Sequence, residues 1–577
     1  SKNHSLHYNI NLSYSKTHAK DFTWIAAWAQ SNRVYLDKSN EKLTKGSRDY
    51  SDALIENTLT YDGKIGKHNI NLVVGQTYEE EYTDELTGWA VNFPEPYFLQ
   101  LQNGASTYSS SYEYKHALTS FIGRLNYNYD EKYLISAVIR RDGSSRLSKN
   151  IRWGTFPSVS VGWRFDKEKF FPISRDVVNM FKVRGSYGVL GNENIGEYMY
   201  QTTMNRNNMT YSFGNTPITG SAVSTFVDNN LAWEKKKTTN VGIDLAMFHN
   251  RLEFTVEWYK NKSEDLLYAV PVPAQAGVSN TSVTMNAASM ENSGFEFSAT
   301  YRNNDHALKY MISANLSTLK NKVTSLGFGT DSYISGAYIT EVGQEIGKFY
   351  GWVYDGIART QADIDNRVND NGDPISQPGV NVGDCLYKDI NNDGIIDAND
   401  QTVLGSGLPK INFGLSGRLE YKNFDLSIST YGALNYHVSD DIYNSLNSCY
   451  GWANKDVAMA DANRWSEDGT TYLSSVPRTY AANNATLAWN DLFSERKIQN
   501  AAYWKIANVE LGYNIPDKIF GGVVNGVRVY VSAQNLYTFT GYKGYNVDYA
   551  GGTFTPGYNF CSFPSARSFM AGLHFTF

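Results

Sequence analysis

A loop near residue 390 carries the oxygen-bearing side chains and the spacing of a calcium-binding loop. The 12 residues from Asp389 to Asp400 place carboxylate, amide and carbonyl oxygens at loop positions one, three, five, seven, nine and twelve. Gly394 stands at position six, where such a loop turns sharply. The sequence therefore predicts a structural calcium site with these ligands: Asp389, Asn391, Asp393, the carbonyl of Ile395, Asp397 and Asp400.

Two departures from the usual pattern leave alternatives open for this loop. Position twelve is Asp400, whose side chain reaches less far for bidentate binding than the usual glutamate. No amphipathic helices flank the loop, so it resembles the calcium loops of extracellular repeats outside the EF-hand family. Calcium is expected ahead of magnesium because the segment could supply six or seven oxygens. The alternative is an Asn- and Asp-rich turn held by its own side-chain hydrogen bonds.

Aromatic side chains in the polar connecting segments are a second group with binding chemistry. Large rings in loops stack on sugar rings, although packing within the loop is the simpler explanation for any one of them. No HExxH, GxSxG or phosphate-loop motif occurs and the nine histidines are scattered, so no catalytic residue is assigned and no enzyme is expected. The candidate substrate contacts are Trp89, Tyr450, Trp452 and Trp489.

Composition narrows the class of protein further. A net charge of -6 with 19% charged residues argues against a nucleic-acid partner. The three cysteines form no CxxC pair, so neither a disulfide framework nor a thiolate metal site is indicated. No apolar run reaches 18 residues, which excludes a transmembrane helix but leaves a transmembrane barrel open. The 14% aromatic content suits barrel girdles and also suits a glycan-binding surface.

The elements that must position these residues are β-strands, because apolar and polar residues alternate along much of the chain. Every second residue is apolar in Ser568 to Phe577, in Leu6 to Tyr14 and in Leu252 to Tyr259. This alternation predicts strands with one apolar and one polar face. The residues expected to face a polar lumen, with their apolar neighbours facing lipid, are Glu253, Thr255, Glu257, Asp425 and Ser427.

Short links between these strands alternate with long polar segments. Turns are expected at Lys16 to Lys20 and at Asp62-Gly63, so the first strand should run inward from the outer side of a membrane. Further short links are predicted at Asp130 to Lys132, His249 to Arg251, Asn303 to Asp305 and Lys422-Asn423, with two longer links at Asp166 to Phe181 and Ile515 to Gly526. Long extracellular loops are predicted at residues 79–114, 191–233, 267–292, 327–410, 438–501 and 540–567.

Loops of these two lengths at opposite ends are typical of outer-membrane barrels. The expected fold class is all-β, a transmembrane antiparallel β-barrel that contributes about 17 strands. Since closed bacterial barrels have an even number of strands, the odd count predicts that the first strands lie outside this chain. A plugged barrel of about 22 strands would then need about five more.

Several stretches together resemble the C-terminal half of SusC/RagA-type TonB-dependent outer-membrane transporters of Bacteroidetes. They follow the family's order over nearly the whole of residues 1–577. The terminal strand and the Asp389 to Asp400 loop also look like the family. The matching stretches are Arg141 to Arg146, Arg152 to Phe165, Lys182 to Gly188, Asn292 to Glu296 and Ser532 to Leu536.

The resemblance implies a 22-stranded barrel in the outer membrane of a Gram-negative, Bacteroidetes-like cell. It also implies a SusD-like surface lipoprotein that lids the outer mouth, and import of oligosaccharides or peptides driven through TonB. The plug, the TonB box and the first strands have no counterpart in this sequence, so a separate N-terminal segment is an expected partner, besides the lipid bilayer. The alternative is a secreted β-rich glycan-binding or adhesin protein without transport activity.

Overall fold

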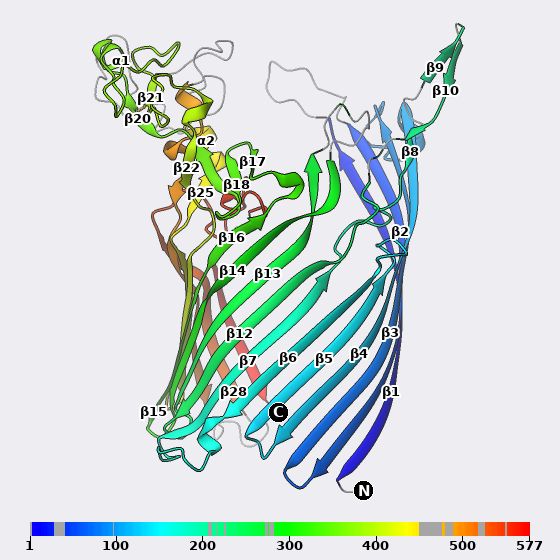
Figure 1. Cartoon of the computed structure of the whole chain (residues 1–577), viewed down its shortest axis with the longest axis vertical. Coiled ribbons are helices and arrows are strands. Elements are labelled where there is room, and N and C mark those ends of the chain that lie inside the picture. Colours follow the sequence, from blue (N-terminus) through cyan, green and yellow to red (C-terminus); the bar gives the residue numbers. More distant parts are fainter. Residues whose placement is uncertain are drawn as a thin grey trace. The chain divides into compact units, whose positions relative to one another are not determined.

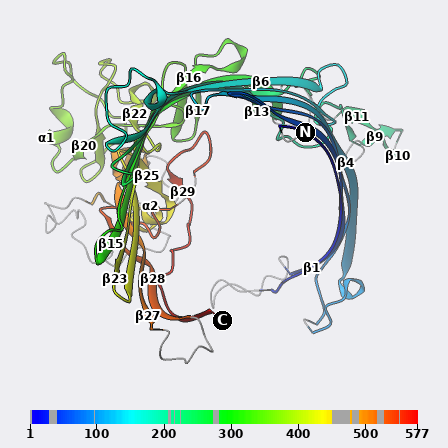
Figure 2. The same ribbon diagram turned by 90° about the horizontal axis from the view of Figure 1, so that it is seen from below.

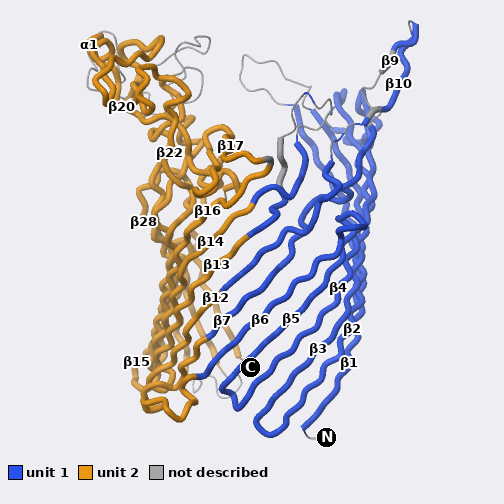
Figure 3. The backbone as a smooth tube through the Cα atoms, viewed as in Figure 1, with its two compact units in different colours: residues 1–164, 184–239, 263–288 blue, residues 165–183, 240–262, 289–577 orange. Residues whose placement is uncertain are grey.

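The computed structural model describes residues 3–27, 41–95, 97–205, 210–214, 216–223, 225, 227–271, 275, 282–448, 476–478, 489–516, 526–548 and 551–576. The predicted substrate contacts Tyr450 and Trp452 lie outside the described residues. The chain divides into two compact units (Figure 3): unit 1 comprises residues 1–164, 184–239 and 263–288, and unit 2 comprises 165–183, 240–262 and 289–577.

Seventeen strands belong to one sheet, as the alternation predicted. They are β1 (His4–Ile25), β2 (Lys42–Ile65), β3 (His68–Val91), β4 (Ser106–Tyr129), β5 (Tyr133–Ser144), β6 (Trp153–Arg164), β7 (Val178–Asn192), β12 (Glu234–Met247), β13 (Leu252–Pro271), β14 (Ser282–Asn303), β15 (Leu308–Thr318), β16 (Lys320–Ser325), β23 (Ile411–Tyr421), β24 (Phe424–Leu434), β27 (Tyr503–Ile515), β28 (Gly526–Thr540) and β30 (Ser568–Thr576). Since only Leu319 separates β15 from β16, these two strands form one pass of the chain. The described part of the sheet therefore has sixteen passes, and the odd number expected from the sequence is wrong.

Shorter elements occupy the connecting segments. The strands are β8 (Met204–Asn205), β9 (Thr210–Phe213), β10 (Thr216–Thr219), β11 (Ala222–Val223), β17 (Ser332–Ser335), β18 (Tyr338–Glu341), β19 (Lys348–Gly351), β20 (Tyr354–Ile357), β21 (Cys385–Tyr387), β22 (Thr402–Gly405), β25 (His437–Asp440), β26 (Gln499–Asn500) and β29 (Tyr558–Asn559). The helices are α1 (Ala362–Asp365) and α2 (Asp441–Leu446), with 3-10 turns η2 (Leu101–Asn103), η3 (Phe165–Lys167), η5 (Gly327–Gly329), η6 (Ala398–Asp400) and η8 (Glu495–Lys497). Among the described residues, no helix is both long and apolar enough to cross a membrane.

In unit 1, strands β1 to β6 pair antiparallel in chain order. Seen along the strands, they form a curved sheet (Figure 2). One face of this sheet exposes apolar side chains, among them Ile135 and Ile139 of β5 and Val159 and Val161 of β6. The stretch Leu6 to Tyr14 covers about 26 Å along the strand. At the usual tilt of barrel strands that is about 20 Å of height, close to the ~25 Å apolar band of an outer-membrane barrel.

Two predicted turns in unit 1 are wrong. Lys16 to Lys20 lie inside β1, where Lys16 pairs with Ser51 of β2, because a strand that rises beyond the apolar band needs only backbone pairing and tolerates polar side chains. The link predicted at Asp62-Gly63 lies at Gly66-Lys67, where Gly66 has a φ of 59°. Glycine adopts this left-handed conformation without steric cost.

The direction predicted for the first strand is also wrong, because β1 continues through the turn predicted at Lys16 to Lys20. His4 of β1 pairs with Gly63 of β2, beside the tight turn that joins β2 to β3. The first described residues therefore lie at the tight-turn end of unit 1 (Figure 1). From there β1 runs toward the end that carries the long connections.

Two predicted loops are also shorter than expected. In the range 79–114, β3 continues to Val91 and β4 starts at Ser106, so only residues 92–105 connect them. In the range 267–292, β13 continues to Pro271 and β14 starts at Ser282. Polar residues occupy both faces in Glu79 to Glu85 of β3 and in much of Ser106 to Glu113 of β4, which hid these two strand ends from a search for alternation. The links at Asp130 to Lys132, His249 to Arg251 and Lys422-Asn423 are confirmed, each with at least one residue at positive φ.

In unit 2, strands β15, β23, β24, β27, β28 and β30 pair antiparallel in chain order. The predicted polar face is present. Arg528 donates to the buried carboxylate of Asp425 through Nε at 3.0 Å, and its Nη2 lies 2.7 Å from the Oε1 of Glu510. Arg302 of the same unit donates to Glu253 at 2.9 Å. The opposite face exposes apolar side chains, among them Ile428, Val529, Val531, Leu573 and Phe575.

Candidate functional site

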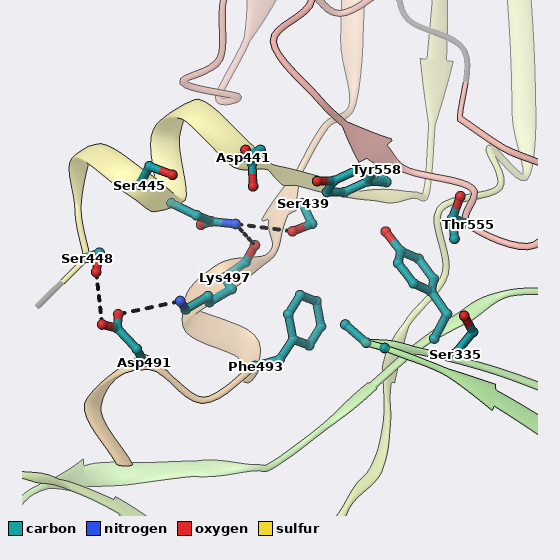
Figure 4. A pocket seen from close by; sticks show the side chains of 14 residues that line it. Ser335, Ser439, Asp441, Ser445, Ser448, Asp491, Phe493, Lys497, Thr555 and Tyr558 are labelled. Carbon is teal, nitrogen blue, oxygen red and sulfur yellow. Dashed lines mark hydrogen bonds and ion pairs between the residues drawn. The ribbon is translucent and has the colours of Figure 1, made fainter. Parts of the chain in front are cut away.

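The candidate site is a cavity of about 620 Å³ in the connecting segments of unit 2, which we call the α2 pocket (Figure 4). Its volume lies within the ~300–1,000 Å³ range of small-molecule sites. Four segments far apart in the sequence form it: the β17–β18 hairpin, the β25–α2 segment, residues 491–497, and the segment around β29. The residues that line it include Ser335, Tyr338, Asp441, Phe493, Lys497 and Tyr558.

Asp440 is the residue that fixes these segments to one another. It is buried, and its Oδ1 caps α2 by accepting from the Tyr443 amide at 2.8 Å. Its Oδ2 accepts from Asn559 of β29 at 2.9 Å and from the hydroxyl of Tyr542. Strand β25 also pairs with β29, Ser439 opposite Tyr558, so α2 and Tyr558 are held by one hydrogen-bond network.

Two of the three charged side chains that line the α2 pocket form an ion pair. Lys497 lies 3.5 Å from Asp491, and the hydroxyl of Ser448 donates to the other oxygen of that carboxylate at 2.8 Å. Asn444 donates to Ser439 and to the carbonyl of Lys497, each at 3.1 Å. Figure 4 shows these contacts as dashed lines along one side of the cavity. The polar side of the pocket is thus preorganised, with Asp441 as its remaining charged group.

Aromatic rings form the other side of the pocket. Tyr338 is 7% exposed and its ring lies 5.2 Å from that of Phe349, yet its hydroxyl has no hydrogen-bond partner within the described part of the chain. Burial raises the pKa of Tyr338, so the hydroxyl stays a neutral donor. Burial, and next the Asp441 carboxylate, likewise raise the pKa of Tyr558. An unsatisfied buried hydroxyl costs about 1–3 kcal/mol.

The predicted calcium loop folds as a compact turn built from its own side chains. The Oδ2 of Asp389 accepts from the Gly394 amide at 2.8 Å, and Gly394 has a φ of 82°. The carboxylate of Asp400 accepts from the amides of Ile390 and Asp397, each at 2.8 Å. Asn391 donates to Asp393 at 2.8 Å. These contacts match the alternative that the sequence left open, an Asn- and Asp-rich turn.

One carboxylate oxygen of that loop takes no part in the hydrogen bonds of the turn. Asp389 is buried, and its Oδ1 has no hydrogen-bond partner within the described residues. Burial opposes ionisation of this carboxyl, but hydrogen bonds from the Gly394 amide and Asn369 outweigh it and lower the pKa of Asp389. Across the described residues, no group of three or more His, Cys, Asp or Glu side chains is placed to hold one metal ion.

The two described aromatic candidates lie in different units, and each makes contacts within its own unit. Trp89 lies in β3 rather than in a loop, stacks on Tyr108 at 5.6 Å, and has the Nζ of Lys42 5.3 Å from its ring centre. Trp489 donates from its ring nitrogen to the carbonyl of Pro378 at 2.9 Å and packs beside Tyr387.

None of the α2-pocket residues was identified from the sequence. Tyr338 and Phe493 come from two different predicted loops, and Tyr558 comes from a third. A partial signal existed, because all three predicted loops are rich in aromatic and hydroxyl residues. Nothing local in the sequence indicates that these segments meet.

Comparison with known proteins identifies the fold and the relatives of the chain. The model of the TonB-dependent receptor-like β-barrel family matches residues 1–536. TonB-dependent receptor P3 of Formosa agariphila is 33% identical over 551 residues, covering 92% of this chain and 53% of that protein. TonB-dependent receptor SusC of Bacteroides thetaiotaomicron is 29% identical over 535 residues, covering 90% and 49%. The chain therefore spans about half the length of the curated relatives it matches.

Solved structures give the same fold. A chain of the RagAB peptide transporter superposes with a TM-score of 0.79 at 24% identity, over 100% of this chain and 60% of that one. At this level of identity the likeness concerns the fold alone. It confirms the predicted all-β, antiparallel transmembrane barrel class.

Proposed function

The chain belongs to the TonB-dependent receptor family of β-barrels, and from that membership we propose that it forms barrel wall and outer loops of a nutrient importer. The family match over residues 1–536 is the observation that carries this proposal. The relatives are receptors and transporters rather than enzymes, which supports a non-catalytic role for this chain as well. The proposed cargo is an oligosaccharide or a peptide.

The proposed location is the outer membrane of a Gram-negative cell of the Bacteroidetes kind. The exposed apolar side chains of the interior strands β5 and β6, such as Ile139 and Val161, support it, because a soluble β-protein buries such faces in a core. A secreted glycan-binding or adhesin protein, the alternative from the sequence, would need that burial. The proposed partners are a SusD-like surface lipoprotein, an N-terminal plug and barrel segment, and TonB acting through that segment.

The test is uptake by cells that make the full-length protein. Cells are given a mixture of oligosaccharides and peptides, and depletion of each component is followed by mass spectrometry. At least one component should disappear from the medium of normal cells and persist with cells lacking either this protein or TonB. Identical depletion with and without the protein would contradict the proposal, and so would protein-dependent uptake that continues without TonB.

We also propose that the loop Asp389 to Asp400 holds a structural calcium ion. The oxygen spacing and the buried, unpartnered Oδ1 of Asp389 support this, and calcium would supply positive charge to that atom. The residues that would hold it are Asp389, Asn391, Asp393, the Ile395 carbonyl, Asp397 and Asp400.

Calcium should therefore stabilise the protein by a measurable amount. At a free concentration 100 times the dissociation constant, binding adds about 2.7 kcal/mol to the stability of the loop region. Limited proteolysis with and without a chelator measures this, with Asp393→Ala as the variant and Asp370→Ala, an acidic neighbour outside the loop, as its control. Chelator-sensitive proteolysis that Asp393→Ala abolishes and Asp370→Ala keeps is the expected result. Equal proteolysis with and without chelator would contradict the calcium site.

A further inference from the structure

We propose that Arg141 and Trp153 bind the phosphate of an anionic membrane lipid, an inference that rests on the proposed outer-membrane location and adds a lipid partner to it. The two residues lie on β5 and β6 of unit 1, which run side by side (Figure 1). Gly143 of β5 pairs with Trp153 of β6, and Arg141 pairs with Thr155. Arg141 supplies a positive charge, and Trp153 supplies the ring over which that charge is held.

Both side chains lie on the exposed apolar face of the sheet. Along β6, Val159 is 46% exposed, whereas Phe156, on the other face, is 6% exposed. Trp153 shares the face of Val159 because successive side chains of a strand alternate. Arg141 is exposed as well, and alternation along β5 places it with Ile139 on this face. An arginine thus stands at the end of a row of exposed apolar side chains.

The two tryptophans of β6 mark the height of this face. Trp153 begins the strand, and Trp163, on the same face, lies at the tight-turn end opposite Tyr133. The ten residue steps between the tryptophans cover about 33 Å of strand. At the usual tilt of barrel strands that is about 25 Å, the height of the apolar band, which carries aromatic girdles at both interfaces. Trp153 therefore lies at the level of the outer lipid head groups, and Arg141 lies just below it.

The guanidinium of Arg141 is held against an aromatic platform built from two further strands. Its central carbon lies 5.4 Å from the centre of the Trp153 ring, and Phe121 of β4 stacks on that ring at 6.2 Å. The platform needs a glycine at position 143, because a Cβ there would lie 2.9 Å from the Trp153 ring. Stacking of this kind occupies the face of the guanidinium and leaves its N–H edge available for an oxyanion.

Arg141 has no counter-charge among the described residues, where its side chain forms neither an ion pair nor a hydrogen bond. Its cationic neighbours are paired: Arg140 with Asp142 and Lys115 with Glu80, each at 2.7 Å. A cation at the edge of the hydrocarbon layer loses part of its hydration, so an anion beside it is stabilising. Phosphate fits this group best, since the guanidinium fork binds two of its oxygens at once.

A lipid matches the surface around Arg141 better than a protein partner does. A lipid molecule offers an anionic head group followed by an acyl chain, and β5 offers a cation followed by the exposed apolar side chains Ile139 and Ile135. Free phosphate has no part that would contact those isoleucines. An acidic side chain of a second copy would pair with Arg141 only if it displaced lipid from the apolar face beside it.

Native mass spectrometry of the purified full-length protein, stripped of lipid in detergent, tests the proposal. The lipid probes are phosphatidylglycerol, whose head group is an anion, and phosphatidylcholine with the same acyl chains, whose phosphate is balanced by its own cation. Inorganic phosphate is the third probe. The variants are Arg141→Gln and Arg141→Lys. The matched control is Arg124→Gln, because Arg124 is exposed on the opposite face of the neighbouring strand β4.

The dissociation constant of the first bound phosphatidylglycerol should rise about fivefold in Arg141→Gln, which is the effect of one cationic side chain at a membrane surface. In Arg141→Lys it should rise about twofold, because lysine keeps the charge but not the fork. Arg124→Gln should bind this lipid as the normal protein does. Phosphatidylcholine should bind more weakly, and equally to the normal protein and every variant. All variants should melt at the temperature of the normal protein, since the substituted side chains are exposed.

Four results would overturn the lipid site: Arg141→Gln binds phosphatidylglycerol as the normal protein does, both lipids bind equally, inorganic phosphate displaces phosphatidylglycerol, or dimers form that Arg141→Gln abolishes. Carbonate extraction of cell membranes examines the location separately. Protein that leaves the membrane without detergent would contradict the proposed location itself. Protein that stays in the membrane, with lipid binding insensitive to Arg141→Gln, would remove the lipid site alone.

Discussion

Replacing Arg528 with alanine is expected to lower the free energy of unfolding by about 3–5 kcal/mol, because it leaves a buried carboxylate without its counter-charge. Asp425 is 6% exposed and accepts from the guanidinium of Arg528, which also lies 2.7 Å from Glu510. Without Arg528 the two carboxylates of the polar face would repel each other. Equilibrium unfolding in urea, in detergent micelles, measures the loss.

The control for this prediction is Arg251→Ala. Arg251 pairs with Asp305 at a turn, and both side chains are about half exposed. Exposed ion pairs contribute about 0–1 kcal/mol, so this variant should stay near the stability of the normal protein. Equal losses in the two variants would show that burial of Asp425 does not set the strength of the network.

Replacing Ile428 with arginine is expected to lower the free energy of unfolding by about 2–4 kcal/mol, and replacing Ser429 with arginine is expected to lower it much less. Ile428 is 38% exposed on the apolar face of β24, and Ser429, next in the strand, lies on the polar face with Asp425. A charge at the lipid face loses its hydration, whereas a charge at the polar face keeps it. The free energy of unfolding from lipid vesicles is measured for Ile428→Arg and for Ser429→Arg.

The paired substitution also separates the two accounts of the fold. In a membrane barrel only position 428 is sensitive to charge. If both variants were equally stable, Ile428 would not contact lipid in the folded protein. A larger loss for Ser429→Arg would reverse the two faces of β24.

Local rules predicted the strands well where one face is apolar. The alternation in Ser568 to Phe577 is the alternation of β30, whose Phe569, Leu573 and Phe575 are exposed on the outward face. Tight links were predictable too, because residues such as Asn250 adopt positive φ at little cost. These signals lie within a few residues of one another, so the sequence displays them directly.

Strand ends were not predictable by the same rule. Beyond the apolar band, stretches such as Lys16 to Lys20 of β1 and Glu79 to Glu85 of β3 carry polar residues on both faces, so polarity no longer alternates while backbone pairing continues. For this reason the alternation pattern predicted a turn at Lys16 to Lys20 and a loop at residues 79–91. The end of a strand is set there by its partner strand, which local patterns do not contain.

The α2 pocket lay beyond sequence reasoning for a different reason. Tyr338 and Tyr558 are separated by more than 200 residues, and the network around Asp440 brings their segments together. By contrast, the loop Asp389 to Asp400 is contiguous, so its turn could be predicted from spacing. Its calcium ion remains a prediction.

The most direct test of the account is the environment of β30 in the full-length protein in lipid bilayers. Spin labels are placed singly at positions 569 to 575, and their accessibility to oxygen and to a water-soluble nickel complex is measured. Labels at 569, 571, 573 and 575 should favour oxygen, which concentrates in lipid, and labels at 570, 572 and 574 should not. Uniform accessibility, or the opposite phase, would contradict a barrel strand whose outward face contacts the membrane.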